Sequence, residues 1–145
     1  MIGLIQRVSS GQVTIDNQIV AKIQIGIVAL VAVQSSDTIE KGERLFERIM
    51  NYRIFPDNAD KMNLSLLDIG GGLIIAPQFT LVADTTRGNR PSFGKNVPAE
   101  VGKHHFEQLI AHAKKEYNNV QHGIFGADMQ VTLTNDGPVT FWLEV

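Results

Sequence analysis

Residues 1–33 have the hydrophobic and polar pattern of a β-sheet. β-Branched side chains dominate this segment, and residues 9–11 and 16–17 have the composition of turns, so we expect three or four short strands. Residues 27–33 are continuously apolar, which is typical of a strand covered on both faces. We therefore expect residues 27–33 at the centre of the core.

The next hydrophobic pattern has helical spacing. Asp37 is a candidate N-cap, and Glu40, three residues later, is placed to complete a capping box. Four apolar residues then recur on one helical face: Leu45, Phe46, Ile49 and Met50. We expect this helix to cover one face of the sheet. Gly42 inside it costs roughly 1 kcal/mol relative to alanine, which favours a close packing contact there.

Two further strands are expected in the middle of the chain. Residues 52–55 predict a short strand that ends in a turn at Pro56-Asp57-Asn58, because proline fixes φ and the two polar side chains can bind the backbone. Residues 73–76 predict a buried strand after three glycines, and this strand leads directly into residues 77–81.

A loop and a second helix follow. Residues 85–99 contain two glycines, two prolines and three basic residues (Arg87, Arg90 and Lys95) but no acidic residue, so we expect a loop with a local positive field. Phe93 is expected to anchor this loop. Residues 98–117 begin with a proline, which suits a first helical turn, and carry an apolar stripe.

The C-terminal residues 129–145 predict two alternating strands around a turn at Asn135-Asp136-Gly137-Pro138. Strands, helix, strands, helix and strands in this order predict an α/β fold. We expect a single domain over residues 1–145, with mixed β-sheets packed against two main helices. A chain of 145 residues is long enough to bury such a core without disulfides.

Composition narrows the functional classes. The chain has no cysteine, which excludes a disulfide framework, a thiolate metal site and a cysteine nucleophile, and a reducing cytoplasm is the expected location. No segment is apolar enough to span a bilayer, and the first residues lack the charge order of a secretory signal. The net charge of -2 argues against broad attraction to DNA or RNA, so an RNA partner has to be bound locally.

Common catalytic templates are missing from the sequence. The four histidines (His104, His105, His112 and His122) lack the helical i, i+4 pair of a zinc site, so we expect no metal and no other cofactor. We expect the histidines on the second helix to lie on a solvated face. No nucleophile elbow, phosphate loop or acid–base pair of carboxylates is present. An enzyme with this sequence would depend on backbone donors, on positioning or on groups of the substrate.

Two short segments allow both a structural and a functional interpretation. By pattern alone, residues 78–81 are a strand and Gly137-Pro138 is a turn, since an X-Pro bond is cis in only about 5–6% of cases in folded proteins. These segments read Pro77-Gln78-Phe79-Thr80 and Gly137-Pro138-Val139-Thr140. Further matching segments are residues 5–8, 52–55, 61–64, 87–93 and 141–143. Together and in this order, they resemble the D-aminoacyl-tRNA deacylase (D-tyrosyl-tRNA(Tyr) deacylase) family along the whole chain.

The resemblance implies a homodimer that dimerises through the sheet region, with the site at the interface. The Gly137-Pro138 motif of one subunit, with a cis peptide, would enter the partner's pocket and act as a chirality filter. Its carbonyl oxygens would collide with an L side chain and leave room for a D side chain or for glycine. Arg7 would hold the motif in place, with a plain surface ion pair as its alternative, and Met129 would pack beside the motif.

The resemblance also implies a reaction, the hydrolysis of the ester between a D-amino acid and the terminal ribose of tRNA. Gln78, Phe79 and Thr80 would form the catalytic segment, in which the N–H groups of Phe79 and Thr80 bind the oxyanion and the RNA 2'-hydroxyl assists the water. Thr80 as a nucleophile is an alternative, but the sequence nearby supplies no base. Position 77 departs from the family pattern, because proline stands there in place of serine.

Three alternatives remain open at this stage. The loop residues Arg87, Arg90 and Lys95 are candidates for contact with the acceptor-stem phosphates of tRNA, and a plain solvated loop is their alternative. For the whole protein, the alternatives are a non-catalytic α/β dimer that binds a small ligand or a protein, and a metal-dependent hydrolase.

Overall fold

The fold is built around one strongly curved, six-stranded sheet. A computed structural model describes residues 1–94 and 96–145. The strand order is β2-β1-β3-β6-β7, and β8 pairs with the other edge of β1. The bounds are β1 Ile2–Ile15, β2 Gln18–Ile23, β3 Gly26–Ala32, β6 Gly72–Pro77, β7 Val120–His122 and β8 Gln130–Glu144. β6 runs parallel to β3 and β7, and the remaining pairs are antiparallel, so the sheet is mixed as expected.

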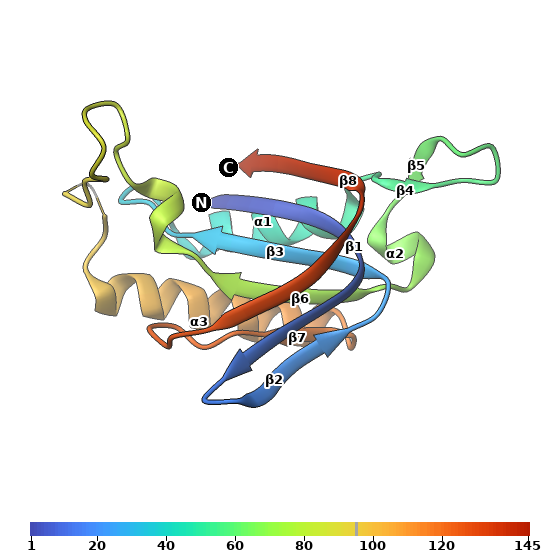
Figure 1. Cartoon of the computed structure of the whole chain (residues 1–145), viewed down its shortest axis with the longest axis horizontal. Coiled ribbons are helices and arrows are strands. Elements are labelled where there is room, and N and C mark those ends of the chain that lie inside the picture. Colours follow the sequence, from blue (N-terminus) through green and yellow to red (C-terminus); the bar gives the residue numbers. More distant parts are fainter. Residues whose placement is uncertain (95) are drawn as a thin grey trace.

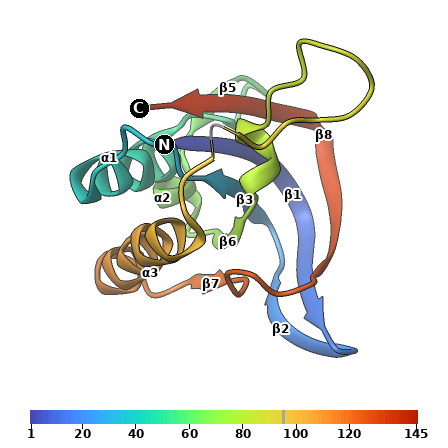
Figure 2. The same ribbon diagram turned by 90° about the vertical axis from the view of Figure 1, so that its left-hand side faces the viewer.

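Two helices cover one face of this sheet (Figure 1, Figure 2). They are α1, Ile39–Asn51, and α3, Ala99–Glu116, which match the two expected helices. The expected stripe of α1 is confirmed, since Leu45, Phe46, Ile49 and Met50 are all buried. Along the chain, four small elements follow α1 and precede α3. They are the hairpin strands β4 (Phe55–Pro56) and β5 (Met62–Leu64), the short helix α2 (Leu66–Ile69) and the 3-10 helix η1 (Phe79–Val82).

The sheet separates two hydrophobic clusters. The larger lies between the sheet and the helices, and the smaller lies on the other face, inside the curve of the sheet. β3 contributes to both, because Ile27, Ala29 and Val31 point to the helices and Val28 points to the smaller cluster. The expectation that residues 27–33 form the centre of the core is therefore confirmed.

Three local expectations at the N-terminal strands and α1 met different outcomes. The turn at residues 16–17 is confirmed, since Asp16 and Asn17 have φ of 48° and 63°, as a tight hairpin turn requires. The prediction of a turn at residues 9–11 is wrong, because β1 continues through these residues and only the register between β1 and β8 shifts there. At Gly42 an added Cβ would meet Met1 Cε at 3.5 Å, so helix α1 packs there at ordinary contact distance.

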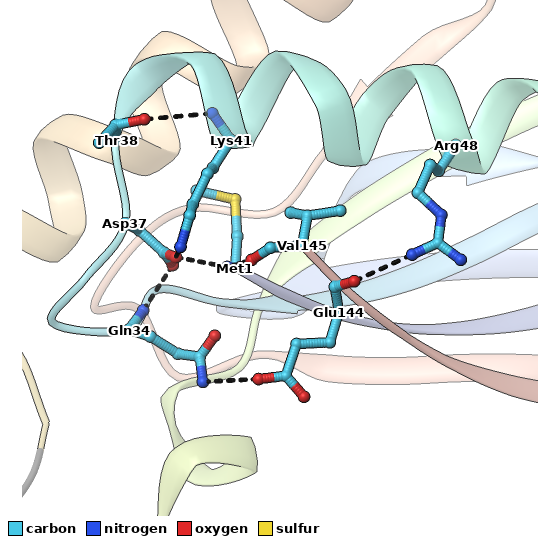
Figure 3. A network of polar contacts seen from close by, with 8 residues as sticks. All are labelled: Met1, Gln34, Asp37, Thr38, Lys41, Arg48, Glu144 and Val145. Atoms are coloured by element: carbon cyan, nitrogen blue, oxygen red, sulfur yellow. Dashed lines mark hydrogen bonds and ion pairs between the residues drawn. The ribbon is translucent and has the colours of Figure 1, made fainter.

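The predicted cap of α1 is wrong by one residue. Thr38 is the N-cap and accepts a hydrogen bond from the Lys41 N–H at 3.4 Å. The Asp37 carboxylate instead binds the α-amino group of Met1 and the N–H of Gln34 (Figure 3). Asp37 therefore joins the start of β1 to the segment before α1, and it is unavailable to cap the helix.

The two expected C-terminal strands are one strand in the structure. β8 continues from Gln130 to Glu144 alongside β1, and the segment expected as a turn is a corner within it. Gln6 pairs with Thr140 and Val8 pairs with Asn135, so residues 136–139 stand opposite the single residue Arg7. This extreme form of a β-bulge pushes Gly137 and Pro138 out of the sheet.

No helix of the described residues combines the length and the hydrophobicity that crossing a membrane requires.

Candidate active site

The carboxyl ends of two parallel strands position the first motif. The pairing of β3 with β6 ends at Val31 and Pro77, and the N–H of Gln78 then donates to the carbonyl oxygen of Val31 at 2.7 Å. From Phe79 the chain forms the helix η1, so the interpretation of residues 78–81 as a strand is wrong. Ligands of open α/β sheets bind beyond the carboxyl ends of strands, which is where η1 lies.

η1 presents two free backbone donors. The first N–H groups of a helix have no partner within it, and no hydrogen bond among the described residues engages the N–H of Phe79 or Thr80. The Thr80 hydroxyl accepts a hydrogen bond from Gln78 Nε2 at 2.6 Å. Two adjacent N–H groups without partners can stabilise a developing negative charge, whereas the Thr80 hydroxyl is held by an amide that cannot act as a base.

A cavity of about 510 Å³ opens beside η1. Its size suits a small molecule or one end of a larger one. Gln78, Phe79 and Met129 line it, and the Phe79 side chain is 58% exposed. Further lining residues come from the start of α3 and the segment before β8, among them Gly102, Phe106 and Phe125. The cavity is therefore mainly apolar, and its polar side chains come from Gln78, Asn96 and Asp128.

Met129 closes one wall of this cavity. A Cβ added to Gly123 would lie 2.6 Å from Met129 Sδ and 3.3 Å from Pro77 Cδ. Met129 thus packs over Gly123, next to the residue that precedes Gln78. The cavity lining of this chain includes Met129 but neither Gly137 nor Pro138.

The second motif forms the exposed corner of β8. The Gly137-Pro138 peptide bond is cis, as the resemblance implies, and Gly137 has a φ of 143°. A Cβ on Gly137 would lie 2.6 Å from Val139 Cγ2, so only glycine fits this position. The bend of β8 and the yellow-green coil of η1 lie at opposite ends of the sheet (Figure 1). The two motifs are therefore not brought together within one chain.

Arg7 lies directly under this corner. Its Nε donates to the carbonyl oxygen of Asp136 at 2.9 Å and lies 3.3 Å from the Asp136 carboxylate, while Nη1 donates to the carbonyl oxygen of Ile54 at 2.7 Å. Only 12% of the Arg7 side chain is exposed. Two backbone acceptors and this burial distinguish Arg7 from a plain surface ion pair.

Comparison with known proteins identifies the family. Residues 4–144 match the family described as D-Tyr-tRNA(Tyr) deacylase. The chain belongs to this family. A protein named D-aminoacyl-tRNA deacylase from Francisella tularensis subsp. tularensis is 52% identical over 145 residues, with all of both chains covered. One of the same name from Pseudomonas putida is 48% identical, again with full coverage of both chains.

Solved structures agree with this deacylase fold. A structure titled c-Myc DNA Unwinding Element Binding Protein superposes with a TM-score of 0.93 at 32% identity, covering 100% of this chain and 99% of that one. A structure titled as a probable eukaryotic D-amino acid tRNA deacylase gives a TM-score of 0.85 at 16% identity, covering 99% of this chain and 98% of that one. At that identity the second structure supports the fold alone.

The basic loop borders η1. Arg87 and Arg90 are exposed, and Lys95 lies outside the described residues. Asp84 and Ser92 form a two-way backbone bridge at the base of the loop, and the ring of Phe93 lies 5.4 Å from that of Phe79. Phe93 therefore anchors the loop to η1, as expected from the sequence.

The four histidines are not grouped into a metal-binding site. Among the described residues, no three acidic or histidine side chains are grouped to bind a metal ion. His112 packs against Phe46 at a ring distance of 5.5 Å and lies 3.6 Å from a Glu43 carboxylate oxygen. His112 thus joins α3 to α1, so the expectation of a solvated face is wrong for this histidine.

A polar network supports the hairpin next to the corner. Arg53 donates to the backbone and side-chain oxygens of Asn63 at 2.6 Å each, and Asn63 Nδ2 donates to Asp57 at 2.7 Å. The hydrogen bond from Asn63, followed by those from the backbone of Lys61 and Ala59, lowers the pKa of Asp57. The ionised carboxylate of Asp57 therefore stabilises the hairpin.

Sequence reasoning missed several residues of the two regions. Phe125 and Gly102 line the cavity, and Asn135 binds the corner, but none was a candidate. A signal existed only for Asn135, since asparagine favours positions next to turns and binds nearby backbone. The positions of Phe125 and Gly102 depend on how α3 packs against the following segment, which no local pattern records.

Proposed function

We propose that this chain is a D-aminoacyl-tRNA deacylase, a hydrolase that cleaves the ester between a D-amino acid and the 3'-terminal ribose of tRNA. Such an enzyme removes D-amino acids that have been attached wrongly to tRNA, before translation uses them. The observation that carries the proposal is the full-length similarity to proteins of that name, at 48–52% identity, with both motif segments at exposed sites. Phe79 lines the cavity and Thr80 is the next residue, and the free N–H groups of these two residues are suited to binding an oxyanion.

The proposed active form is a homodimer that associates through the sheet region. The support is geometric. The corner at Gly137 and Pro138 projects from the sheet, and η1, beside the cavity, lies at the opposite end of the sheet within the same chain. A second copy can place its corner in this cavity, with Met129 beside it. Each dimer then contains two equivalent sites, since a two-fold axis makes the exchange reciprocal.

Discrimination between enantiomers is proposed to be steric. The carbonyl oxygens of Gly137 and Pro138 would face the α-carbon of the substrate, so an L side chain would collide with backbone. A D side chain would point into open space, and this is exclusion of the wrong substrate rather than attraction of the right one. Glycine has no side chain to exclude, so glycyl-tRNA is expected to be hydrolysed as well.

The proposed reaction needs no side-chain nucleophile. Water attacks the ester carbonyl carbon, and the N–H groups of Phe79 and Thr80 stabilise the oxyanion. The bond to the ribose 3'-oxygen breaks, and this oxygen takes up a proton from the attacking water with help from the neighbouring 2'-hydroxyl. One donor of this kind is typically worth about 2.7–4 kcal/mol of transition-state stabilisation. The reaction requires no cofactor and no metal.

The proposed partner is the aminoacylated end of tRNA, bound in the cytoplasm. Arg87, Arg90 and Lys95 follow η1 in the chain and would contact the acceptor-stem phosphates. With a net charge of -2, the protein lacks a broad surface attraction for nucleic acid, so we expect local contacts of this kind.

The test is a deacylation assay with purified protein on D-Tyr-tRNA and L-Tyr-tRNA, with and without a chelator, alongside its mass in solution. We expect a dimer that hydrolyses the D substrate much faster than the L substrate and is unaffected by chelation. Equal rates with both enantiomers, or a monomer with full activity, would contradict the mechanism. Absence of hydrolysis would favour the non-catalytic binding dimer, and loss of activity on chelation would favour a metal-dependent hydrolase.

A second candidate function comes from one relative. The 32% identical structure is titled as a DNA unwinding element binding protein. We expect no DNA binding here, because the chain is acidic overall. Titration of a DNA duplex tests this directly, and binding at physiological salt with a Kd below about 10⁻⁶ M, tighter than typical non-specific binding, would contradict the expectation.

A further inference from the structure

Asn135 is a polar residue at the base of the β8 corner. Its side chain is partly buried, and it is the last residue of β8 paired with β1 before the corner, opposite Val8. Val139, the first residue after Pro138, is buried at 7% exposure. The exposed pair Gly137 and Pro138 thus stands between two residues that are anchored in the sheet.

The side chain of Asn135 spans this base. Its Oδ1 accepts a hydrogen bond from the Val139 N–H at 2.6 Å, and its Nδ2 donates to the Thr140 hydroxyl at 2.9 Å and to the Val139 carbonyl oxygen at 3.4 Å. One primary amide therefore serves both backbone groups of Val139. It replaces the strand partner that Val139 lacks, because residues 136–139 have no paired residue on β1.

Arg7 and Asn135 hold the corner from its two sides. Arg7 binds the carbonyl oxygen of Asp136, the residue before Gly137, and Asn135 binds the N–H and carbonyl of Val139, the residue after Pro138. With both flanking residues fixed, the directions of the two intervening carbonyl groups are set. Pro138 adds stiffness, because its ring restricts φ.

We propose that Asn135 is a positioning residue for enantiomer selection, acting through the hydrogen bonds that fix the direction of the Gly137 and Pro138 carbonyl oxygens. This inference rests on the proposed function. It adds a second anchor to the one assigned to Arg7, and it explains why an amide is suited to the position: aspartate lacks the donor, and alanine lacks both groups.

The test compares Asn135→Ala and Asn135→Ser with the wild type by measuring kcat/KM for D-Tyr-tRNA and L-Tyr-tRNA. The expected result is a fall in the D-to-L ratio of about five- to tenfold, the range that corresponds to one hydrogen bond of ordinary net strength. Asn135→Asp retains the acceptor for the Val139 N–H, so it should lose less of the ratio than alanine. Thr134→Ala, an exposed neighbour on β8, is the control and should leave the ratio unchanged.

The ratio separates positioning from a merely structural role, since partial unfolding lowers both activities by the same factor. A folded serine variant with the wild-type ratio would overturn the proposal. Loss of folding in both the alanine and serine variants would also overturn it, since Asn135 would then be a residue of the fold. If the wild type itself shows no preference for the D substrate, the proposed function fails first, which is a distinguishable result.

Discussion

Arg7 Nη1 lies 2.7 Å from the carbonyl oxygen of Ile54, so the residue under the β8 corner is also fixed to the segment that enters β4. Since the same guanidinium binds Asp136, replacement by alanine removes two charge-assisted hydrogen bonds of about 1.5–3 kcal/mol each. We expect Arg7→Ala to lower the D-to-L ratio of kcat/KM at least tenfold.

The matched variants separate charge from geometry. Arg7→Lys keeps the charge but cannot bind both acceptors with a planar fork, so we expect it to resemble alanine. Arg44→Ala removes an exposed arginine on α1 and should leave the ratio unchanged. A lysine variant with the wild-type ratio would show that charge alone is sufficient and that the fork is unnecessary.

Thr80→Ala is expected to retain most of the activity. The Thr80 hydroxyl accepts a hydrogen bond from Gln78, and the proposed catalytic donor is the backbone N–H, which alanine keeps. Single-turnover rates should fall by no more than about threefold, which is below 1 kcal/mol. Mass spectrometry of the stopped wild-type reaction is the companion measurement, and an acyl adduct on Thr80 would replace the backbone mechanism with a covalent one.

Pro77→Ser restores the residue that the family pattern has at this position. The ladder bond from Gln78 N–H to Val31 and the free donors at Phe79 and Thr80 do not involve the ring of Pro77, so activity should be similar in both proteins. The measurement is kcat/KM on D-Tyr-tRNA. A gain of about 100-fold or more with serine would mean that its hydroxyl or its N–H supplies a catalytic group that the proline protein lacks.

Local periodicity predicted most of the fold. The apolar stripes of α1 and α3 and the continuous run of β3 depend on spacing within one element, and the structure confirms them. The failures arose where a distant residue decides the outcome. The Asp37 carboxylate binds the α-amino group of Met1 and therefore does not cap α1. Pairing with β1 on both sides of the corner keeps β8 one continuous strand.

The candidate site shows the same division. The motif residues could be named because a resemblance supplied them, and the structure places Gln78, Phe79 and Met129 at one cavity. Their distance from Gly137 and Pro138 could not be predicted, since it depends on the curvature of the whole sheet. The bracing of Val139 by Asn135 also required the actual path of the corner.

The basic loop should control the salt dependence of tRNA binding. Each phosphate contact contributes a slope of about -0.7 to -0.9 to the logarithm of affinity against the logarithm of salt concentration. We expect the double variant Arg87→Ala with Arg90→Ala to bind more weakly and to reduce this slope by about one to two. The control removes two exposed lysines at the end of α3, Lys114 and Lys115. A slope that is flat in the wild type would remove the loop from the tRNA contact.

The last prediction concerns the ion pair that joins the start of β1 to the segment before α1. The Met1 α-amino group and the Asp37 carboxylate bind each other, and both side chains have 0% exposure (Figure 3). Asp37→Asn leaves a buried ammonium group without its counter-charge, and removal of one partner of such a pair costs about 3–5 kcal/mol. At roughly 2–4 °C per kcal/mol for a chain of this size, Tm should fall by about 10 °C. Glu47→Gln removes an exposed carboxylate from α1 and is the matched control, with an expected change within about 0.5 kcal/mol. Calorimetry of the three proteins at neutral pH decides the matter: equal Tm values would mean that other acceptors, such as the Val145 carbonyl oxygen 2.9 Å from the same ammonium group, are sufficient and that the ion pair adds little.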